Sequence, residues 1–239
     1  MKVIVCGANG AMGKLICQRV EAELVGRVSL DGENGVPKTF EELGIVEADV
    51  LIDFSHHTAA PGIMQWAKAH KVAVIMCTTG HTEQEQQEIR AAADTIPVFY
   101  SANMSLGVAL LAELAKKTAA AFPDADIEIV ETHHNRKMDA PSGTALMLGR
   151  AVQTVRPNAV FHLGRSGMGK RTAEEIGFHA IRRGNVPGIH EIIVSTDTQA
   201  ITLRHEVYDR ALFADGALSA ARFLAGKAPG LYDMTDIIR

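Results

Sequence analysis

The first twenty residues constrain the fold most strongly, because a strand, a glycine-rich turn and a helix follow one another there. Residues 2–6 are an apolar, β-branched run typical of a buried strand. The sequence GANGAMG follows at residues 7–13, and apolar positions at helical spacing continue to Val20. Glycines here allow a tight turn, a close approach of the backbone to a pyrophosphate, and packing of the helix on the sheet. The order predicts a dinucleotide-binding domain, with a simple packing turn as the alternative interpretation of the GxxGxxG spacing.

Strands and helices alternate as far as residue 100. We expect strands at residues 24–30, 48–54, 72–76 and 97–100, with helices at 61–70 and 83–93. Repeated βα units imply a parallel sheet. Small polar loops follow the strands, at the edge where open α/β sheets bind ligands. His56 and His57 follow one strand, either as site residues or, as is more usual, as a solvated strand end.

An acidic residue follows the second expected strand. Asp31 lies 18 residues after Gly13, about where a carboxylate binds the ribose of a dinucleotide, and Glu33 is the competing candidate. No lysine or arginine closely follows either acid, so a 2′-phosphate would meet unbalanced negative charge. The pattern therefore favours NADH over NADPH. Lys14 and Arg27 are the residues that could reverse this preference.

The rest of the chain has a different pattern. We expect an apolar helix at 106–121, then strands at 160–162, 176–182, 191–196 and 200–208 in an antiparallel or mixed sheet, then a helix at 211–225. Residues 163–175 are rich in glycine and charge, so they form either a mobile lid or a plain connection. The change of pattern indicates a nucleotide domain and a separate sheet domain.

The segment at 128–146, EIVETHHNRKMDAPSGTAL, carries the clearest chemical signal. A buried strand at 127–130 is followed by His133, His134 and Lys137. Proline at 141 disfavours helix at the residue before it, so residues 133–140 are expected to form an exposed loop.

A helix follows that loop. Ser142 is a plausible N-cap, and the helix N-terminus would point its free N–H groups back at the loop. Histidine titrates near neutral pH, so the segment predicts a site that binds a carboxylate and delivers protons. A solvated basic loop explains the spacing equally well.

The composition and net charge exclude several classes of binding partner. The net charge of −4 argues against nucleic acid or an acidic membrane as the main partner. The apolar runs are too short to cross a bilayer, and the start of the chain enters a strand without a signal peptide. Cys6, Cys17 and Cys77 form no CxxC pair or ligand cluster, so we expect reduced thiols, a cytoplasmic protein and no structural metal.

Three motifs together resemble the 4-hydroxy-tetrahydrodipicolinate reductase (dihydrodipicolinate reductase) family of bacterial lysine biosynthesis. They are GANGAMG at 7–13, CTTG at 77–80 with SANMSLGV at 101–108, and ETHHNRKMDAPSGTAL at 131–146. The similarity covers essentially the whole chain, including IGFHAIRRGNVPGIHE and the closing ADGALSAARFLAGKAPGLYDM. The string HHxxKxDAPSGTA is highly specific, whereas the glycine-rich turn is not.

The resemblance implies an α/β enzyme of two domains. A Rossmann-type parallel sheet in residues 1–104 is completed by the last helices in residues 211–239, and this domain binds the dinucleotide. Residues 105–210 form an α+β domain with a mixed sheet, which binds substrate and assembles a homotetramer. The boundary residues act as hinges that bring nicotinamide to substrate. The implied reaction is the NAD(P)H-dependent reduction of 4-hydroxy-tetrahydrodipicolinate, a small dicarboxylate, to tetrahydrodipicolinate.

Roles follow from the motif positions. His133 matches the proton donor, Lys137 the second catalytic donor, and the substrate contacts are His134, Gly143 and Thr144. The cofactor contacts implied by the resemblance are Gly7, Ala8, Asn9, Gly10, Ala11, Met12, Asp31, Cys77, Thr78, Thr79, Ser101, Ala102, Asn103 and Met104.

Two departures from the family pattern matter. Cys77 stands where the family usually has glycine. Asn9, Ala11 and Gly32 stand where members that use NADPH well have basic residues. NADH is therefore the expected cofactor, with NADPH as a second one.

Other functions compete with this interpretation. A Rossmann-type dehydrogenase could act on a different imine or aldehyde, although no tyrosine is followed four residues later by lysine, as the short-chain class requires. A dinucleotide-sensing regulator would keep the glycine turn but has no need of the histidines and the lysine. An inactive homologue serving as an assembly partner is disfavoured because no motif position is visibly broken.

Overall fold

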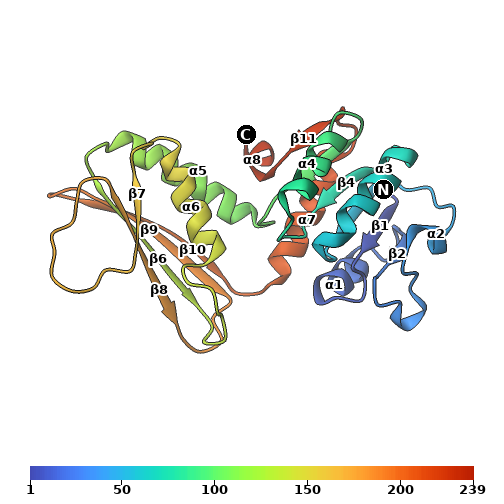
Figure 1. Ribbon diagram of the computed structural model, residues 1–239, viewed down its shortest axis with the longest axis horizontal. Coiled ribbons are helices and arrows are strands. Elements are labelled where there is room, and N and C mark those ends of the chain that lie inside the picture. Colours follow the sequence, from blue (N-terminus) through green and yellow to red (C-terminus); the bar gives the residue numbers. More distant parts are fainter. The chain divides into compact units, whose positions relative to one another are not determined.

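The computed structural model describes residues 1–239 and divides the chain into two compact units (Figure 1). The N-terminal unit consists of Met1–Ser105 together with Ala211–Arg239, so the end of the chain returns to it. The central unit consists of Leu106–Arg210. Each unit has its own sheet and its own buried core.

The N-terminal unit contains a six-stranded, wholly parallel sheet, as the repeated βα units predict. The strand order is β11-β5-β4-β3-β1-β2. The strands are β1 (Val3–Cys6), β2 (Leu24–Val28), β3 (Val50–Asp53), β4 (Ala73–Met76), β5 (Pro97–Tyr100) and β11 (Gly230–Tyr232). The predicted α/β class is confirmed.

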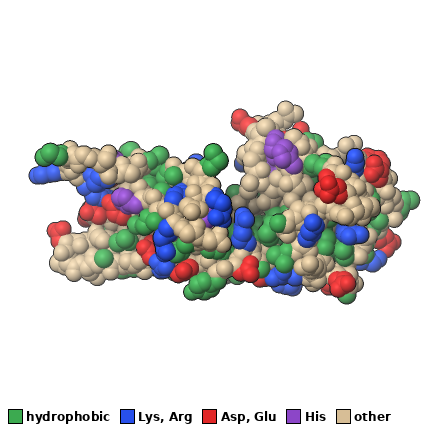
Figure 2. Space-filling view, turned by 90° about the horizontal axis from the view of Figure 1, so that it is seen from below, with side chains coloured by type: hydrophobic (Ala, Val, Ile, Leu, Met, Phe, Trp, Pro, Cys, Tyr) green, Lys and Arg blue, Asp and Glu red, His purple; other side chains and the backbone are tan.

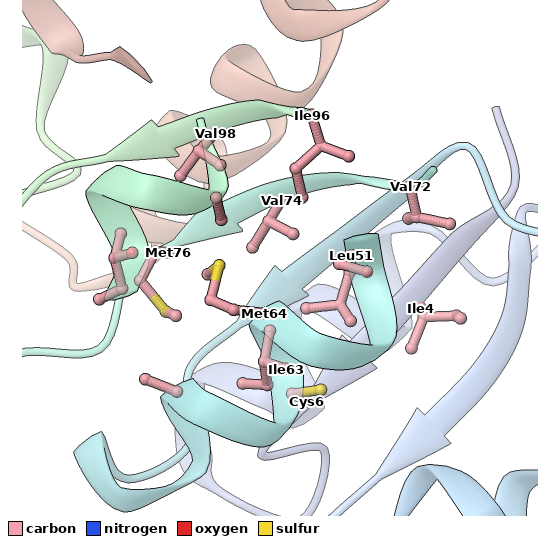
Figure 3. Packing of buried hydrophobic residues seen from close by; sticks show 14 of the residues in the cluster. Ile4, Cys6, Leu51, Ile63, Met64, Val72, Val74, Met76, Ile96 and Val98 are labelled. Atoms are coloured by element: carbon pink, nitrogen blue, oxygen red, sulfur yellow. The ribbon is translucent and has the colours of Figure 1, made fainter. Parts of the chain in front are cut away.

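Helices cover both faces of this sheet because its strands are apolar on both sides. Ile4, Leu51 and Val74 pack against α3 (Ala60–His70) and α4 (Glu83–Ala92) in the cluster shown in Figure 3. Successive strand residues point to opposite faces of the sheet. On the face opposite α3 and α4, the helices α1 (Ala11–Arg19) and α7 (Ala211–Leu224) contact the strands and each other. Short elements complete the unit: η1 (Glu33–Gly35), α2 (Phe40–Leu43), η2 (His57–Ala59) and α8 (Met234–Ile238).

The last strand was not predicted from the sequence. Residues 230–232 pair in parallel with β5, and Leu231 lies opposite Val98. Three residues are too few to show the alternation of a strand, so only the pairing reveals it. The chain therefore completes this sheet with a strand as well as with helices.

The central unit contains a five-stranded mixed sheet in the order β10-β9-β6-β8-β7. Its strands are β6 (Asp126–His133), β7 (Val160–Leu163), β8 (Glu175–Arg182), β9 (Gly188–Ser195) and β10 (Ala200–Val207). The middle strand β6 pairs in parallel with β8 and antiparallel with β9. The helices α5 (Leu106–Ala121) and α6 (Gly143–Gln153) pack on the sheet around Ile129, Phe178 and Ile192.

The glycine-rich segment between β7 and β8 contains no helix or strand, as predicted. Two of its arginines are held by acids: Arg165 pairs with Glu175, and Nε of Arg171 donates to Glu128 Oε1 over 3.1 Å. Positive, negative and apolar side chains are interspersed on the face drawn in Figure 2. No helix is both long enough and apolar enough to span a membrane, and no group of three or more histidine, cysteine or acidic side chains is arranged to hold a metal.

Candidate active site

The end of β6 places Glu131 and His133 on one face of the central sheet, because residues two apart in a strand point the same way. His133 is the last strand residue and is only 8% exposed. The prediction of an exposed loop from residue 133 is therefore wrong at its first position. His133 pairs with Arg182 on β8, and Thr132 pairs with Ile189 on β9. These pairings extend the strand beyond the expected residues 127–130. The loop begins at His134.

Glu131 is the centre of a buried ionic cluster and is 1% exposed. Its Oε2 lies 2.6 Å from Nδ1 of His133 and 2.8 Å from Nη1 of Arg182. Its Oε1 accepts from Nη2 of Arg182 at 2.7 Å and from the backbone N–H of Ser142 at 3.0 Å. Burial alone would raise the pKa of Glu131, but the hydrogen bonds from His133, Arg182 and Ser142 lower it to about 2. The carboxylate is therefore ionised at neutral pH.

This carboxylate determines the orientation of the His133 ring. An ionised carboxylate only accepts hydrogen bonds, so Nδ1 of His133 must carry a proton and donate it. The other nitrogen, Nε2, then faces Gly188, where an added Cβ would lie 3.2 Å from it. Glycine at 188 leaves room beside the one nitrogen of His133 that can exchange a proton with a ligand.

A second histidine, His190 on β9, packs edge-on against His133 with ring centroids 5.1 Å apart. Burial, followed by the positive charge of His133, lowers the pKa of His190 to about 4. The Ser142 hydroxyl accepts from the N–H of Ala145 and forms a second hydrogen bond with Nε2 of His190, 3.1 Å away. At neutral pH His190 is uncharged, so it is a structural neighbour of His133 rather than an acid.

Ser142 joins this cluster to the start of α6. Its side chain caps the helix by accepting from Ala145 N at 3.2 Å, which confirms the predicted N-cap. Gly143 is exposed, and nothing lies within 4 Å of the position its Cβ would take. The N-terminus of α6, where Gly143 and Thr144 lie, therefore opens beside Glu131 and can attract an anion.

The loop between β6 and α6 carries the remaining predicted residues. The Lys137 N–H donates to the carbonyl of His134 across a turn, and its ammonium lies 2.8 Å from Asp139 Oδ1. Burial and then the positive charges of Arg136, His133 and Lys137 lower the pKa of His134. One short segment thus brings His133, His134 and Lys137 together with the start of α6.

The glycine turn of the N-terminal unit has no room for side chains. Gly7 has a φ of +74°, and a Cβ on it would lie 2.3 Å from the carbonyl oxygen of Phe54. A Cβ on Gly13 would lie 2.0 Å from the carbonyl oxygen of Gly7. Gly10 precedes α1 without any side-chain cap, and the first turn of that helix has no acid. The turn therefore fits a pyrophosphate at the N-terminus of α1.

Asp31 is exposed close to this turn. Its Oδ1 accepts from Asn9 Nδ2 at 2.6 Å and from the backbone N–H of Glu33 at 3.1 Å. The bond from Asn9 is the main reason that the pKa of Asp31 is lowered. Asn9 thus ties the glycine turn to the acid, while the competing Glu33 contributes its backbone to the same carboxylate.

A cavity of about 410 Å³ opens beside the turn and is partly lined by Gly7, Leu30 and Ser55. Trp66 on α3 forms part of its wall and stacks on Phe40 at 4.8 Å and on His70 at 4.3 Å. A mostly apolar cavity with an aromatic wall, next to a phosphate-type turn, is suited to the nucleoside end of a dinucleotide.

The other predicted cofactor residues follow β4 and β5 at the carboxyl edge of the same sheet. Cys77 and Thr78 are buried, and Thr79 is exposed. Burial raises the pKa of the Cys77 thiol well above its ordinary value, so this cysteine is not a reactive thiolate. After β5, the Ser101 hydroxyl donates to the carbonyl of Asn103 at 2.8 Å, which closes a tight loop.

The histidine pair after β3 has a structural partner. Nδ1 of His57 lies 3.0 Å from both carboxylate oxygens of Glu85 on α4, and the His56 ring packs against His57 at 4.3 Å. His57 is thus not simply a solvated strand end, although His56 is exposed. His57 links the loop after β3 to the start of α4.

Sequence reasoning missed three members of the His133 cluster: Glu131, Arg182 and His190. The sequence could have indicated Glu131, because residues 131 and 133 are two apart and an extended strand puts both on one face. No local pattern connects Arg182 or His190 to that strand. Their proximity follows from the pairing of β8 and β9 with β6.

Comparison with known proteins agrees with these features. The family model described as "Dihydrodipicolinate reductase, N-terminus" matches residues 1–104, and "Dihydrodipicolinate reductase, C-terminus" matches residues 107–238. The chain is 40% identical to the 4-hydroxy-tetrahydrodipicolinate reductase of Clostridium novyi, over 100% of this chain and 98% of that protein. It is 42% identical to the enzyme of the same name from Caldanaerobacter subterraneus, over 100% and 98% of the two chains.

A solved structure shares the fold. The dipicolinate-bound dihydrodipicolinate reductase of Paenisporosarcina sp. TG-14 superposes with a TM-score of 0.81 at 24% identity, covering 98% of this chain and 97% of that one. Two family models together span nearly the whole sequence, and full-length relatives exceed 30% identity. The chain therefore belongs to the 4-hydroxy-tetrahydrodipicolinate (dihydrodipicolinate) reductase family.

Proposed function

We propose that this protein is an NAD(P)H-dependent 4-hydroxy-tetrahydrodipicolinate reductase of the diaminopimelate and lysine pathway. The observation that carries the proposal is the buried Glu131–His133–Arg182 cluster beside the N-terminus of α6. This cluster offers an oriented proton donor next to an anion-attracting helix end. Family membership makes a cyclic dicarboxylate the substrate that such a site would take.

His133 is the proton donor of the proposal. Its Nδ1 is held by Glu131, so Nε2 is the atom that delivers a proton to a ring carbon of the substrate. The neighbouring carboxylate also stabilises the positive charge of a doubly protonated ring. Neutral His190 packs against the ring and keeps it in place.

Lys137 and the start of α6 form the anion-binding part. The ammonium of Lys137 balances substrate charge and is the second catalytic donor. His134 contacts the substrate, and the backbone N–H groups of Gly143 and Thr144 hold a ring carboxylate. Asp139, which pairs with Lys137 at 2.8 Å, is largely exposed. A ligand carboxylate can therefore replace Asp139 as the partner of that lysine.

The N-terminal unit holds the nicotinamide dinucleotide. The turn at 7–12 receives the pyrophosphate, Asp31 the ribose, and the loops at 77–79 and 101–104 surround the nicotinamide. When bound, the reduced cofactor supplies a hydride to the substrate. Asp31 and the absence of basic residues in the turn favour NADH, with NADPH as a second cofactor.

The central sheet supports a homotetramer. One of its faces packs on α5 and α6, while half-buried residues such as Val130 and Ile193 alternate toward the other face. We place the assembled enzyme in the cytoplasm, where its three free cysteines would stay reduced.

The direct test follows NADH oxidation by absorbance, with and without freshly generated 4-hydroxy-tetrahydrodipicolinate. Substrate-dependent oxidation that yields tetrahydrodipicolinate is the expected result. Tight NADH binding without turnover would instead identify a dinucleotide-sensing regulator. Turnover only with another imine or aldehyde would identify a different dehydrogenase.

A further inference from the structure

The turn between β8 and β9 lies alongside the loop between β6 and α6. Directly beyond the last residue pair of β6 and β8, the Arg183 N–H donates to the carbonyl of His133 at 2.9 Å. The Asn135 N–H then donates to the carbonyl of Gly184 at 3.2 Å. Gly184 has a φ of +50°, a left-handed conformation that glycine adopts without strain. The turn and the loop therefore continue the pairing past the ends of both strands.

Side-chain hydrogen bonds fasten the same loop at two points. Near its start, Nη2 of Arg136 donates to Oδ1 of Asn185 at 2.6 Å. Arginine only donates hydrogen bonds, so the amide oxygen of Asn185 must be the atom that faces it. Near its end, Nη2 of Arg182 donates to the carbonyl of Asp139 at 2.7 Å. The end of β8 and the turn after it thus hold the loop at both ends.

Apolar packing contributes little to the position of this loop. Residues 135, 136 and 138–140 are exposed, and the one apolar side chain with length, Met138, is 97% exposed. Lys137 lies between the two fastened points. Since an exposed hydrogen bond contributes only modestly to stability, the conformation of the loop depends on each of its bonds to the turn.

Asn185 is the member of this arrangement with no second role. Arg182 also binds Glu131 through both of its Nη atoms, so its loss would disturb the His133 cluster. Asn185 is exposed, and its side chain bonds only to Arg136. A substitution of Asn185 therefore acts on the loop and leaves the buried cluster in place.

We propose that Asn185 is a positioning residue of the reductase: through Arg136, it holds the loop between β6 and α6 in the conformation in which His134 and Lys137 meet a cyclic dicarboxylate. The inference rests on the function proposed above and adds to it a residue that does not itself touch the substrate.

This role has a distinct kinetic consequence. Without the bond to Asn185, the loop spends part of its time in other conformations, and the apparent affinity for the dicarboxylate falls in proportion to the competent fraction. A saturating ligand repopulates the competent conformation, because it binds that conformation better than the others. Binding therefore weakens while the maximal rate is nearly retained.

The test combines steady-state kinetics with calorimetric titration of the full-length protein by dipicolinate, a planar pyridine dicarboxylate, at saturating NADH. In Asn185→Ala, dipicolinate should bind about five-fold more weakly, as for the loss of one hydrogen bond. KM should rise by about the same factor, while kcat falls less than about two-fold. NADH affinity should not change. Asn185→Asp keeps the acceptor oxygen and should bind dipicolinate within about two-fold of wild type.

Two controls separate this role from a general effect of substitution. Asn158→Ala removes an exposed asparagine of the same unit, ahead of β7, and should bind dipicolinate like wild type. In an Arg136→Ala background, Asn185→Ala should cause no further loss, because the bond between the two side chains is already absent.

Several results would overturn the role of Asn185 while leaving the proposed function intact. They are an unchanged dipicolinate affinity in Asn185→Ala, an equal loss in Asn185→Asp or Asn158→Ala, or a full further loss in the Arg136→Ala background. A fall in kcat at unchanged KM also overturns it, because Asn185 would then act on the chemical step and not on the loop. A wild-type protein that neither binds dipicolinate nor turns over 4-hydroxy-tetrahydrodipicolinate refutes the proposed function, and the inference with it.

Discussion

The glycine turn of the N-terminal unit and the His133 cluster of the central unit are built in opposite ways. The turn works through missing side chains, because a Cβ at Gly7 or Gly13 would collide with neighbouring backbone. The cluster works through side chains from β6, β8 and β9 that gather around Glu131, together with the Ser142 backbone N–H at the helix start. The glycine turn offers backbone N–H groups, which do not titrate. The His133 cluster offers side chains whose charge depends on their neighbours.

This contrast predicts how each site fails. Substitutions in the turn should act by steric collision and weaken dinucleotide binding without altering any proton-transfer step. Substitutions in the cluster should act through charge and orientation and change catalysis or pH dependence while NADH binding persists. The following experiments test that separation.

The largest effect is expected for His133→Ala. Loss of a general acid lowers kcat by about 10²- to 10⁴-fold, while the NADH dissociation constant stays unchanged because His133 belongs to the central unit. Steady-state kinetics and NADH titration measure the two quantities. Normal turnover in this variant would remove His133 from the mechanism.

Glu131→Gln should lower the free energy of unfolding and should make that free energy less dependent on pH. Breaking the buried pair with Arg182 costs about 3 kcal/mol of unfolding free energy at neutral pH. The folded-state pKa of Glu131, about 2, lies below its ordinary 4.5, so its stabilisation is complete above pH 4.5 and is lost as the pH falls toward 2.

The measurement is urea unfolding of both proteins at about pH 6 and about pH 3. The stability gap between wild type and Glu131→Gln should narrow at the lower pH. A gap of constant size would show that the carboxylate is not the titrating group. NADH affinity should be the same in both proteins.

Gly13→Ala tests the backbone side of the comparison. The added methyl group would stand 2.0 Å from the Gly7 carbonyl oxygen, and overpacking of this kind costs about 1–3 kcal/mol. NADH should bind more weakly, whereas a planar pyridine dicarboxylate should bind the central unit as before. Unaltered NADH affinity would mean that the turn does not approach the pyrophosphate.

The smallest effect is expected for Asp31→Asn, which keeps the shape of the side chain and removes its charge. Loss of one charge-assisted hydrogen bond to the ribose should weaken NADH about five-fold, with less loss for NADPH. Comparative titration of the two cofactors checks this. Equal losses for both would assign ribose recognition to Glu33 or to no acid at all.

Much of the fold was readable from local sequence. The parallel sheet followed from repeated βα units, and the Ser142 N-cap from the residues around it, because strand alternation, helical spacing and capping are short-range properties. Boundaries were less accurate where pairing decides them. β6 runs on to His133, and β11 is three residues that become a strand only beside β5.

By itself, the sequence determined which chemical groups are present and in what order: the glycine turn, the acid after β2, the histidines and the lysine before α6. Only the tertiary structure decided which of them meet. Arg182 and His190 reach Glu131 through strand register. The physical reason is that backbone propensities act over a few residues, whereas the pKa of Glu131 and the partners of a cation depend on groups brought close by pairing and packing.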